Sequence, residues 1–374
     1  MLRVLCRGAT VVLTGMVVLA LAGCAGVPKA QLQAYSSAYD ELQSAAALVY
    51  ADAAPALSAG NPANAPQFPD TLGSPTFDRH GCGAVVASID SLRARCHALV
   101  AAKAYNQALL DLSAGGRVDD ALSLVDSALA SLTTLGGLLP VPGAAPAIAT
   151  LNAVAEPLKA ILGEALKARD RAALLDALLR GEPQLRALMA ALRSDVDSLY
   201  AVQRTFAEQG LQKNKNDIDR DLNAAFSQVA NHAAPKDPAV AASLALLQDK
   251  FESTFSASEP RPGHRLKEVG FSGTAAAAPF DQASLVFVER QLLAAAEDVA
   301  RFKATGARYQ ASAQALEKFD ALIAAWGKSL TDVISASRQP FSQGGGVEQA
   351  LLSLTAVRDQ ARDIKRILEA RKGH

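Results

Sequence analysis

The chain has 374 residues; half are hydrophobic, only 5% are aromatic, and 37 basic residues balance 37 acidic ones. A neutral chain lacks the basic surface that nucleic acids and anionic lipids attract, so the composition argues against nucleic-acid binding and against a polybasic membrane patch. Alanine dominates many windows. Because alanine is the best helix former, whereas strands favour β-branched and aromatic residues, we expect an all-α fold.

The first 24 residues have the layout of an export signal. Arg3 and Arg7 precede an uncharged run from Gly8 to Ala22, and the run ends in Leu21-Ala22-Gly23-Cys24. A basic start, an apolar middle and small residues at the cleavage point are typical of secretory leaders. The apolar run of about 15 residues is shorter than the roughly 20 that a membrane-spanning helix needs.

The end of this leader resembles the lipobox of bacterial lipoproteins. The resemblance implies that residues 1–23 are a signal peptide and that Cys24 carries a diacylglycerol on its sulfur and an acyl chain on its new amino group. Alanine, not aspartate, follows the cysteine, which implies an outer-membrane anchor facing the periplasm; an inner-membrane or surface location stays open. The alternative is an ordinary secreted protein cut near Ala22. Removal of the leader leaves 35 basic and 37 acidic residues.

Two further cysteines, Cys82 and Cys96, remain in the mature chain. On one straight helix they would lie about 20 Å apart, whereas a disulfide needs Cα atoms within about 7 Å. A bridge therefore requires the chain to fold back between them, which the glycines on both sides of Cys82 permit. An oxidising periplasm favours a Cys82–Cys96 disulfide. Two free thiols, or a metal site completed by His80 and His97, are the alternatives; the spacing matches no usual zinc pattern, so we expect no metal.

The N-terminal half predicts a series of helices separated by Pro- and Gly-rich stretches. The first spans residues 29–57, and its apolar steps alternate between three and four, which is typical of a coiled-coil seam. Its tyrosines are expected to fill the core. Further helices are predicted at 88–114, 118–135 and 147–179, and a long one begins at 182 because Gly181 and Pro183 mark a boundary. The inward positions of the first helix are Leu32, Tyr35, Tyr39, Leu42, Ala46, Val49 and Ala53.

The C-terminal half predicts fewer and longer helices. The long helix weakens around 210–216 and is followed by a short helix at 238–256 and a loop at 259–280. Helices at 281–337 and 347–371, joined by a Gly-rich turn, form an antiparallel hairpin. We therefore expect an elongated antiparallel helical bundle with long coiled-coil-like helices: an N-terminal bundle over 24–258, the loop, and a hairpin over 281–374 that packs on the same bundle. Two stacked bundles split near the loop are the alternative.

One apolar segment stands out because residues 127–155 contain no charged side chain. It is too short for two membrane-spanning helices, which need about 40 residues together. Its leucines form a candidate contact surface at the tip of a helical hairpin, facing a bilayer or a partner, or they pack inside the end of the bundle. These residues are Leu132, Leu135, Leu138 and Leu139.

A search for catalytic motifs finds no HExxH pair, no phosphate-binding GxxxxGK loop and no GxSxG elbow. The acidic run Asp217–Asp221 resembles the start of a calcium loop but lacks the glycine at the sixth position and the glutamate at the twelfth. We interpret it as a solvated helix face. No catalytic residue and no cofactor is expected.

Together these features predict a non-enzymatic lipoprotein with a binding or scaffolding role in the periplasm. The lipid on Cys24 holds it to the membrane, and an envelope protein is its expected partner. A carrier of a small hydrophobic ligand or lipid is the second hypothesis, although alanine-rich seams let helices approach closely and disfavour large cavities. An enzyme that uses scattered residues such as His97 or Asp219 is the third.

Overall fold

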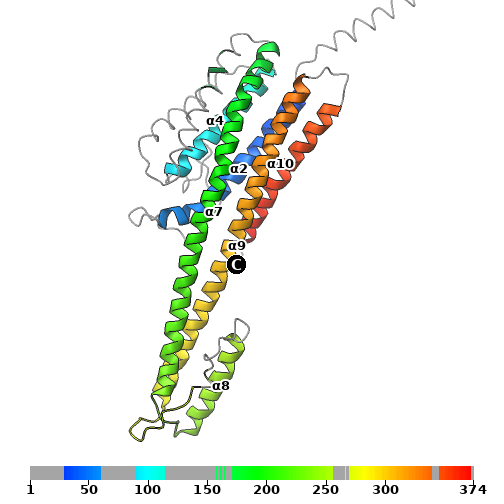
Figure 1. Ribbon diagram of the computed structural model, residues 1–374. Helices are drawn as coiled ribbons and strands as arrows, with labels where there is room; N and C mark the ends of the chain where they lie inside the picture. The colour runs from blue at the N-terminus through cyan, green and yellow to red at the C-terminus, as the bar shows by residue number, and fades with distance from the viewer. Residues whose placement is uncertain are drawn as a thin grey trace, which may run out of the picture. The chain divides into compact units, whose positions relative to one another are not determined.

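The computed structural model describes residues 29–59, 90–113, 171–255, 269–338 and 345–371, together with Pro157, Ala160, Ile161, Glu164 and Leu266. Over these residues the regular structure consists of six α-helices and no strand, so the predicted all-α class is confirmed (Figure 1). The helices are α2 (Lys29–Ala59), α4 (Asp90–Ser113), α7 (Arg171–Ala230), α8 (Pro238–Phe255), α9 (Gln282–Arg338) and α10 (Gly345–Ala370).

The chain divides into two compact units. The first comprises Met1–Gln203 and Ala311–Gly373, and the second comprises Arg204–Gln310 with His374. Both limits between them fall inside long helices, so α7 and α9 each contribute to both units. The predicted loop at 259–280 lies within the second unit.

In the first unit, α9 runs antiparallel to α7. Arg186 of α7 donates to the hydroxyl of Thr331 at 2.7 Å, and Arg193 pairs with Asp320 at 2.7 Å. A later residue of α7 thus contacts an earlier residue of α9, so the two helices run in opposite directions.

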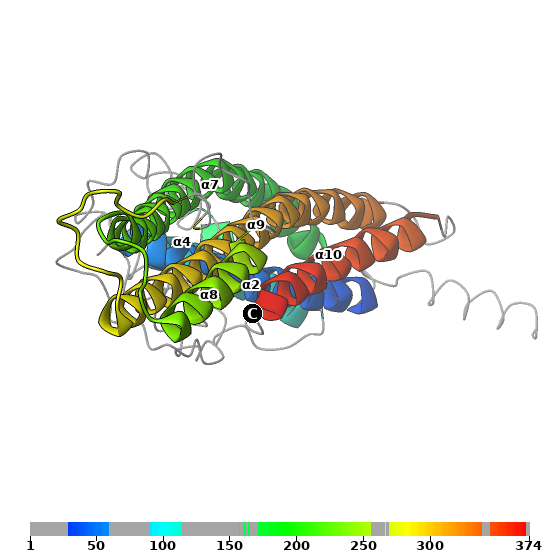
Figure 2. The ribbon, with the colours of Figure 1, turned by 90° about the horizontal axis from the view of Figure 1, so that it is seen from below.

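The helix α10 folds back along α9 in the same unit. Lys318 lies 3.6 Å from the carboxylate of Asp363, and Arg371 donates to Ser312 at 3.3 Å. The predicted antiparallel pairing of the last two helices is thus confirmed. The helix α2 contacts both α10 and α4, and it lies beside α10 in both views of the ribbon (Figures 1 and 2).

The core of the first unit is built on α2, and all seven inward positions predicted for this helix are buried. The aromatic side chains pack on one another. The rings of Tyr39 and Trp326 meet edge to face with centroids 5.0 Å apart, and Trp326 Nε1 donates to the hydroxyl of Tyr35 at 3.0 Å. Tyr50 packs in the same manner on Phe319. The prediction that the tyrosines of this helix fill the core is confirmed.

The predicted helix boundary at Gly181 and Pro183 is wrong, because α7 continues through both residues. The reason is a tertiary contact. A Cβ added at Gly181 would lie 2.0 Å from the hydroxyl of Tyr105, so the missing side chain makes room for this ring. Tyr105 in turn donates to the carbonyl oxygen of Ala177 at 2.7 Å. Packing against α4 thus outweighs the local helix-breaking preference of Gly and Pro.

The predicted weakening of this helix at residues 210–216 is also wrong, since α7 is helical throughout. Here Gly210 lies against Thr305 of α9, with 3.5 Å between the position of an added Cβ and the threonine methyl group. Asn214 donates to the Thr305 hydroxyl at 3.4 Å. Two residues that disfavour an isolated helix therefore have partners in the second unit.

The second unit has its own core, made by the end of α7, by α8 and by the start of α9. Asp281 caps α9, because its carboxylate accepts the backbone N–H of Ser284 at 2.8 Å. The hydrogen bonds from Ser284 lower the pKa of Asp281 below its usual value. The buried residues of this core are Leu222, Ala225, Val229, Val240, Leu244, Phe251, Leu266, Phe280, Leu285, Val288, Leu292 and Ala295.

Candidate functional site

Most of the sites predicted from the sequence lie outside the described residues. This holds for Cys24, for Cys82 and for the apolar segment with Leu132, Leu135, Leu138 and Leu139. Cys96 is described: it is buried in α4 and disulfide-bonded, and its partner lies outside the described residues. The pairing of Cys96 with Cys82 stays a prediction.

Beside Cys96, a buried ion pair joins α4 to α7. The guanidinium of Arg95 makes two hydrogen bonds to the carboxylate of Asp195, one through Nε and one through Nη2 at 2.6 Å. The two side chains are only 8% and 6% exposed. Two parallel charge-assisted bonds are the strongest arrangement that arginine and a carboxylate form. The pair therefore fixes the register of two helices whose residues are 100 positions apart.

The phenol of Tyr50 lies within the electrostatic field of this pair. Burial raises the pKa of Tyr50, the negative charge of Asp195 raises it further, and the positive charge of Arg95 partly offsets both. Among the described residues, the Tyr50 hydroxyl has no hydrogen-bond partner. A phenol held neutral in this way is poorly suited to give up a proton near neutral pH.

The two residues named for the enzyme hypothesis belong to different units. His97 is buried in α4 of the first unit, and Asp219 is half-buried in α7 of the second. Over the residues that the structure describes, no three histidine, cysteine or acidic side chains form a group that could hold a metal ion.

A second buried network in the first unit gathers four helices at Asp52 of α2. Its carboxylate accepts hydrogen bonds from Arg371, just past the end of α10, and from Gln203 of α7 at 3.1 Å. Arg371 also donates to Ser312 of α9. Asp52 and Arg371 are 319 positions apart, so one carboxylate ties the first described helix to the end of the chain.

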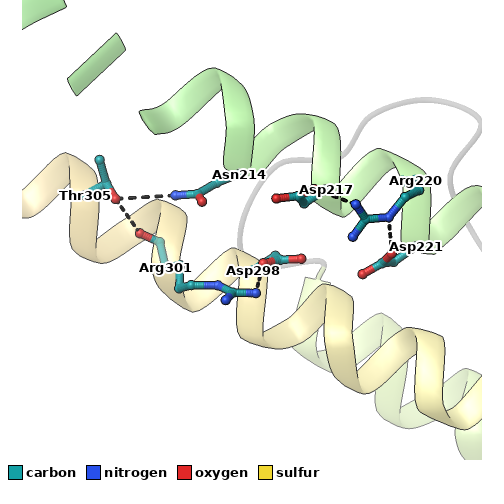
Figure 3. Close-up of polar contacts among 7 residues, drawn as sticks. All are labelled: Asn214, Asp217, Arg220, Asp221, Asp298, Arg301 and Thr305. Atoms are coloured by element: carbon teal, nitrogen blue, oxygen red, sulfur yellow. Dashed lines mark hydrogen bonds and ion pairs between the residues drawn. The ribbon is translucent and has the colours of Figure 1, made fainter. Parts of the chain in front are cut away.

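The second unit contains a polar cluster between α7 and α9 (Figure 3). Arg220 pairs with Asp217 at 2.7 Å and with Asp221 at 2.8 Å, and Arg301 pairs with Asp298. The carboxylates of Asp221 and Asp298 are 8% and 3% exposed, whereas both arginines extend into solvent. The prediction that the run Asp217–Asp221 is a solvated helix face is therefore wrong for Asp221.

The buried charges of this cluster are balanced by nearby arginines. Each buried carboxylate has an arginine of its own helix as counter-ion, which removes the cost of an unpaired buried charge. The cluster also connects the two helices, because Asn214 of α7 and the backbone of Arg301 share the Thr305 hydroxyl (Figure 3). Of these contacts, the hydrogen bond from Asn214 to Thr305 at 3.4 Å is the one that joins α7 to α9; the ion pairs lie within single helices.

Because four tyrosines of the first unit are buried, we expect the free energy of unfolding to fall sharply at high pH. Burial raises the pKa of Tyr35, Tyr39, Tyr50 and Tyr105 well above the usual value near 10. The folded state then keeps protons that the unfolded chain loses, so stability is complete below about pH 10 and falls as pH rises, by up to about 5 kcal/mol per pH unit for four groups.

We expect ionisation of these four buried tyrosines and loss of Trp326 fluorescence to occur together in one cooperative step above pH 10. The measurement is an alkaline titration followed by ultraviolet absorbance and by fluorescence. Gradual ionisation of all tyrosines with unchanged fluorescence would contradict the buried assignment.

Comparison with protein-family models, with curated proteins and with solved structures gave no match to this chain. Within the described ranges, none of the helices combines the length and the hydropathy needed to cross a membrane.

Proposed function

We propose that the chain is a lipoprotein of the bacterial cell envelope, anchored through lipid on Cys24, with a non-enzymatic binding or scaffolding role in the periplasm. The observation that carries this proposal is the N-terminal run in which Arg3 and Arg7, an uncharged apolar stretch and small residues lead directly to Cys24. More than one acyl chain on one cysteine gives a stable membrane anchor, so no spanning helix is needed.

The folded part supports binding rather than ligand transport. The largest fully buried side chains of the first unit are Trp326 and four tyrosines, and they contact one another, backbone carbonyl groups or, for Tyr50, the ring of Phe319. The interior positions between α2, α4 and α9 are thus occupied by the protein's own side chains. Packed helices held at a membrane are suited to present a surface to a partner.

Replacement of Cys24 with alanine is expected to abolish lipid attachment and to release the protein from membranes. The change is tested in a bacterial host by labelling with a fatty-acid analogue, membrane fractionation and mass spectrometry of the N-terminal peptide. The matched control is Cys6→Ala, because under this proposal Cys6 is removed with the leader and its loss leaves acylation unchanged.

The same strains test the binding role. In-cell crosslinking of the tagged, lipidated protein is expected to capture an envelope protein reproducibly and in stoichiometric amount. A Cys24→Ala chain that still carries lipid would refute the anchor. A lipidated chain that captures no protein, while known complexes crosslink in the same cells, would refute the binding role and favour the carrier hypothesis.

A further inference from the structure

The helix α9 carries apolar side chains on two opposite faces within the second unit. One face, which includes Leu285, Val288 and Leu292, is buried in the core of that unit. On the other face Val286 is 54% exposed and Leu293 is 52% exposed. Removing leucine and valine side chains from water lowers the free energy, so their exposure on one helix face favours contact with another surface.

The exposed face has the spacing of a coiled-coil seam. Its residues follow one another in steps of four and three along α9, and every one of them is exposed. Steps of this kind keep side chains on one line of a helix. This line, which we call the α9 outer stripe, consists of Val286, Arg290, Leu293, Glu297 and Ala300.

The two charged side chains of the α9 outer stripe have no ion-pair partner among the described residues. Arg290 and Glu297 form no ion pair with any other residue that the structure describes. Arg301 of the same helix differs, because it is bound to the carboxylate of Asp298. The stripe therefore presents one free positive and one free negative charge, with Leu293 between them.

We propose that a second copy of this chain docks on the α9 outer stripe, with the two helices antiparallel about a two-fold axis near Leu293. In this arrangement Arg290 of each copy faces Glu297 of the other, so two ion pairs form. Leu293 meets its equivalent at the centre, and Val286 lies opposite Ala300. An isologous contact requires a surface that is complementary to itself, and the order of charges on the stripe meets this requirement.

The contact is short, so the pairing is weak. From Val286 to Ala300 the stripe extends about 21 Å at 1.5 Å per residue. A single helix pair of this length buries less than the roughly 1,200–2,000 Å² of stable interfaces. The dimer is therefore favoured where copies are concentrated, such as on a shared membrane. The proposal goes beyond the proposed function: the pairing rests on the α9 outer stripe itself, and a shared membrane only raises the concentration at which two copies meet.

Cysteine crosslinking of the full chain in cells tests the geometry. Leu293→Cys is expected to give a disulfide-linked dimer under mild oxidation, because the two-fold axis brings the two positions together. Ala304→Cys is the matched control: Ala304 is exposed on the same helix face, but in an antiparallel pair its two copies lie about 33 Å apart along the helix axis. The unchanged chain sets the background from native cysteines.

Charge exchange tests the chemistry. Arg290→Glu places like charges opposite each other twice, and we expect about a 2- to 30-fold weaker dimer, the range given by two exposed ion pairs. Adding Glu297→Arg to the same chain is expected to restore crosslinking at Leu293→Cys. Equal crosslinking at both cysteine positions, a purely monomeric Leu293→Cys chain, a crosslink to another protein only, or no rescue by the double exchange would each overturn the proposal.

Discussion

Replacing Gly181 with alanine is expected to destabilise the first unit by about 2–4 kcal/mol, through overpacking and loss of one buried hydrogen bond. The added Cβ would lie 2.0 Å from the hydroxyl and 2.5 Å from Cζ of Tyr105. The ring must therefore move, and the hydrogen bond from Tyr105 to the Ala177 carbonyl is lost. Elsewhere in a helix the same change is stabilising, since alanine is the better helix former.

The measurement is urea unfolding followed by fluorescence of Trp326, which is the only tryptophan of the chain and lies in the core of the first unit. The matched control is Gly306→Ala in α9, where nothing lies within 4 Å of an added Cβ. We expect this change to raise the free energy of unfolding by about 0.5–1 kcal/mol, as measured by urea unfolding followed by circular dichroism. In a Tyr105→Leu background, Gly181→Ala should cost much less. An equal cost in both backgrounds would sink the explanation.

Removal of either partner of the buried ion pair has the second large effect. Arg95→Met or Asp195→Leu alone leaves a buried charge without its counter-ion, which costs about 3–5 kcal/mol. The double variant leaves no charge, and we expect it to recover most of the loss. The free energy of unfolding of the four proteins, from denaturant curves at neutral pH, gives the coupling energy of the pair.

The chain provides a matched control in Arg193 and Asp320, which join α7 to α9 in the same unit but are 55% and 39% exposed. Breaking this surface pair is expected to cost less than about 1 kcal/mol. Equal losses from the buried and the exposed pair would show that burial does not set the effect.

The helices with a regular apolar pattern were predictable from the sequence. The first helix was placed within two residues of α2, because its buried stripe repeats at helical spacing over the whole segment. The short helix α8 and the pair α9 and α10 were found for the same reason. A pattern within one segment carries this information, since the residues that share a face are three or four positions apart.

Contacts between distant segments were not predictable in this way. Gly181 was interpreted as a helix end, because its role depends on Tyr105, a residue of another helix. The local sequence pattern does not predict that Arg95 pairs with Asp195 or that Asp52 pairs with Arg371. In the second unit, the burial of Asp221 was likewise not evident from the local sequence pattern. The lipid anchor, the partner of Cys96 and the uncharged segment at 127–155 remain predictions.

The first unit is built from the two ends of the chain, with the second unit inserted between them. Trp326 bonds to Tyr35 across 291 positions, and Arg371 bonds to Asp52 across 319. Contacts between residues so far apart in the sequence form slowly. Since a chain is synthesised from its N-terminus, α4 can pack on α2 early, but the part of the α2 stripe that contacts α9 and α10 stays uncovered until those helices are made. During that interval α2 is the segment on which we expect a holding chaperone to act.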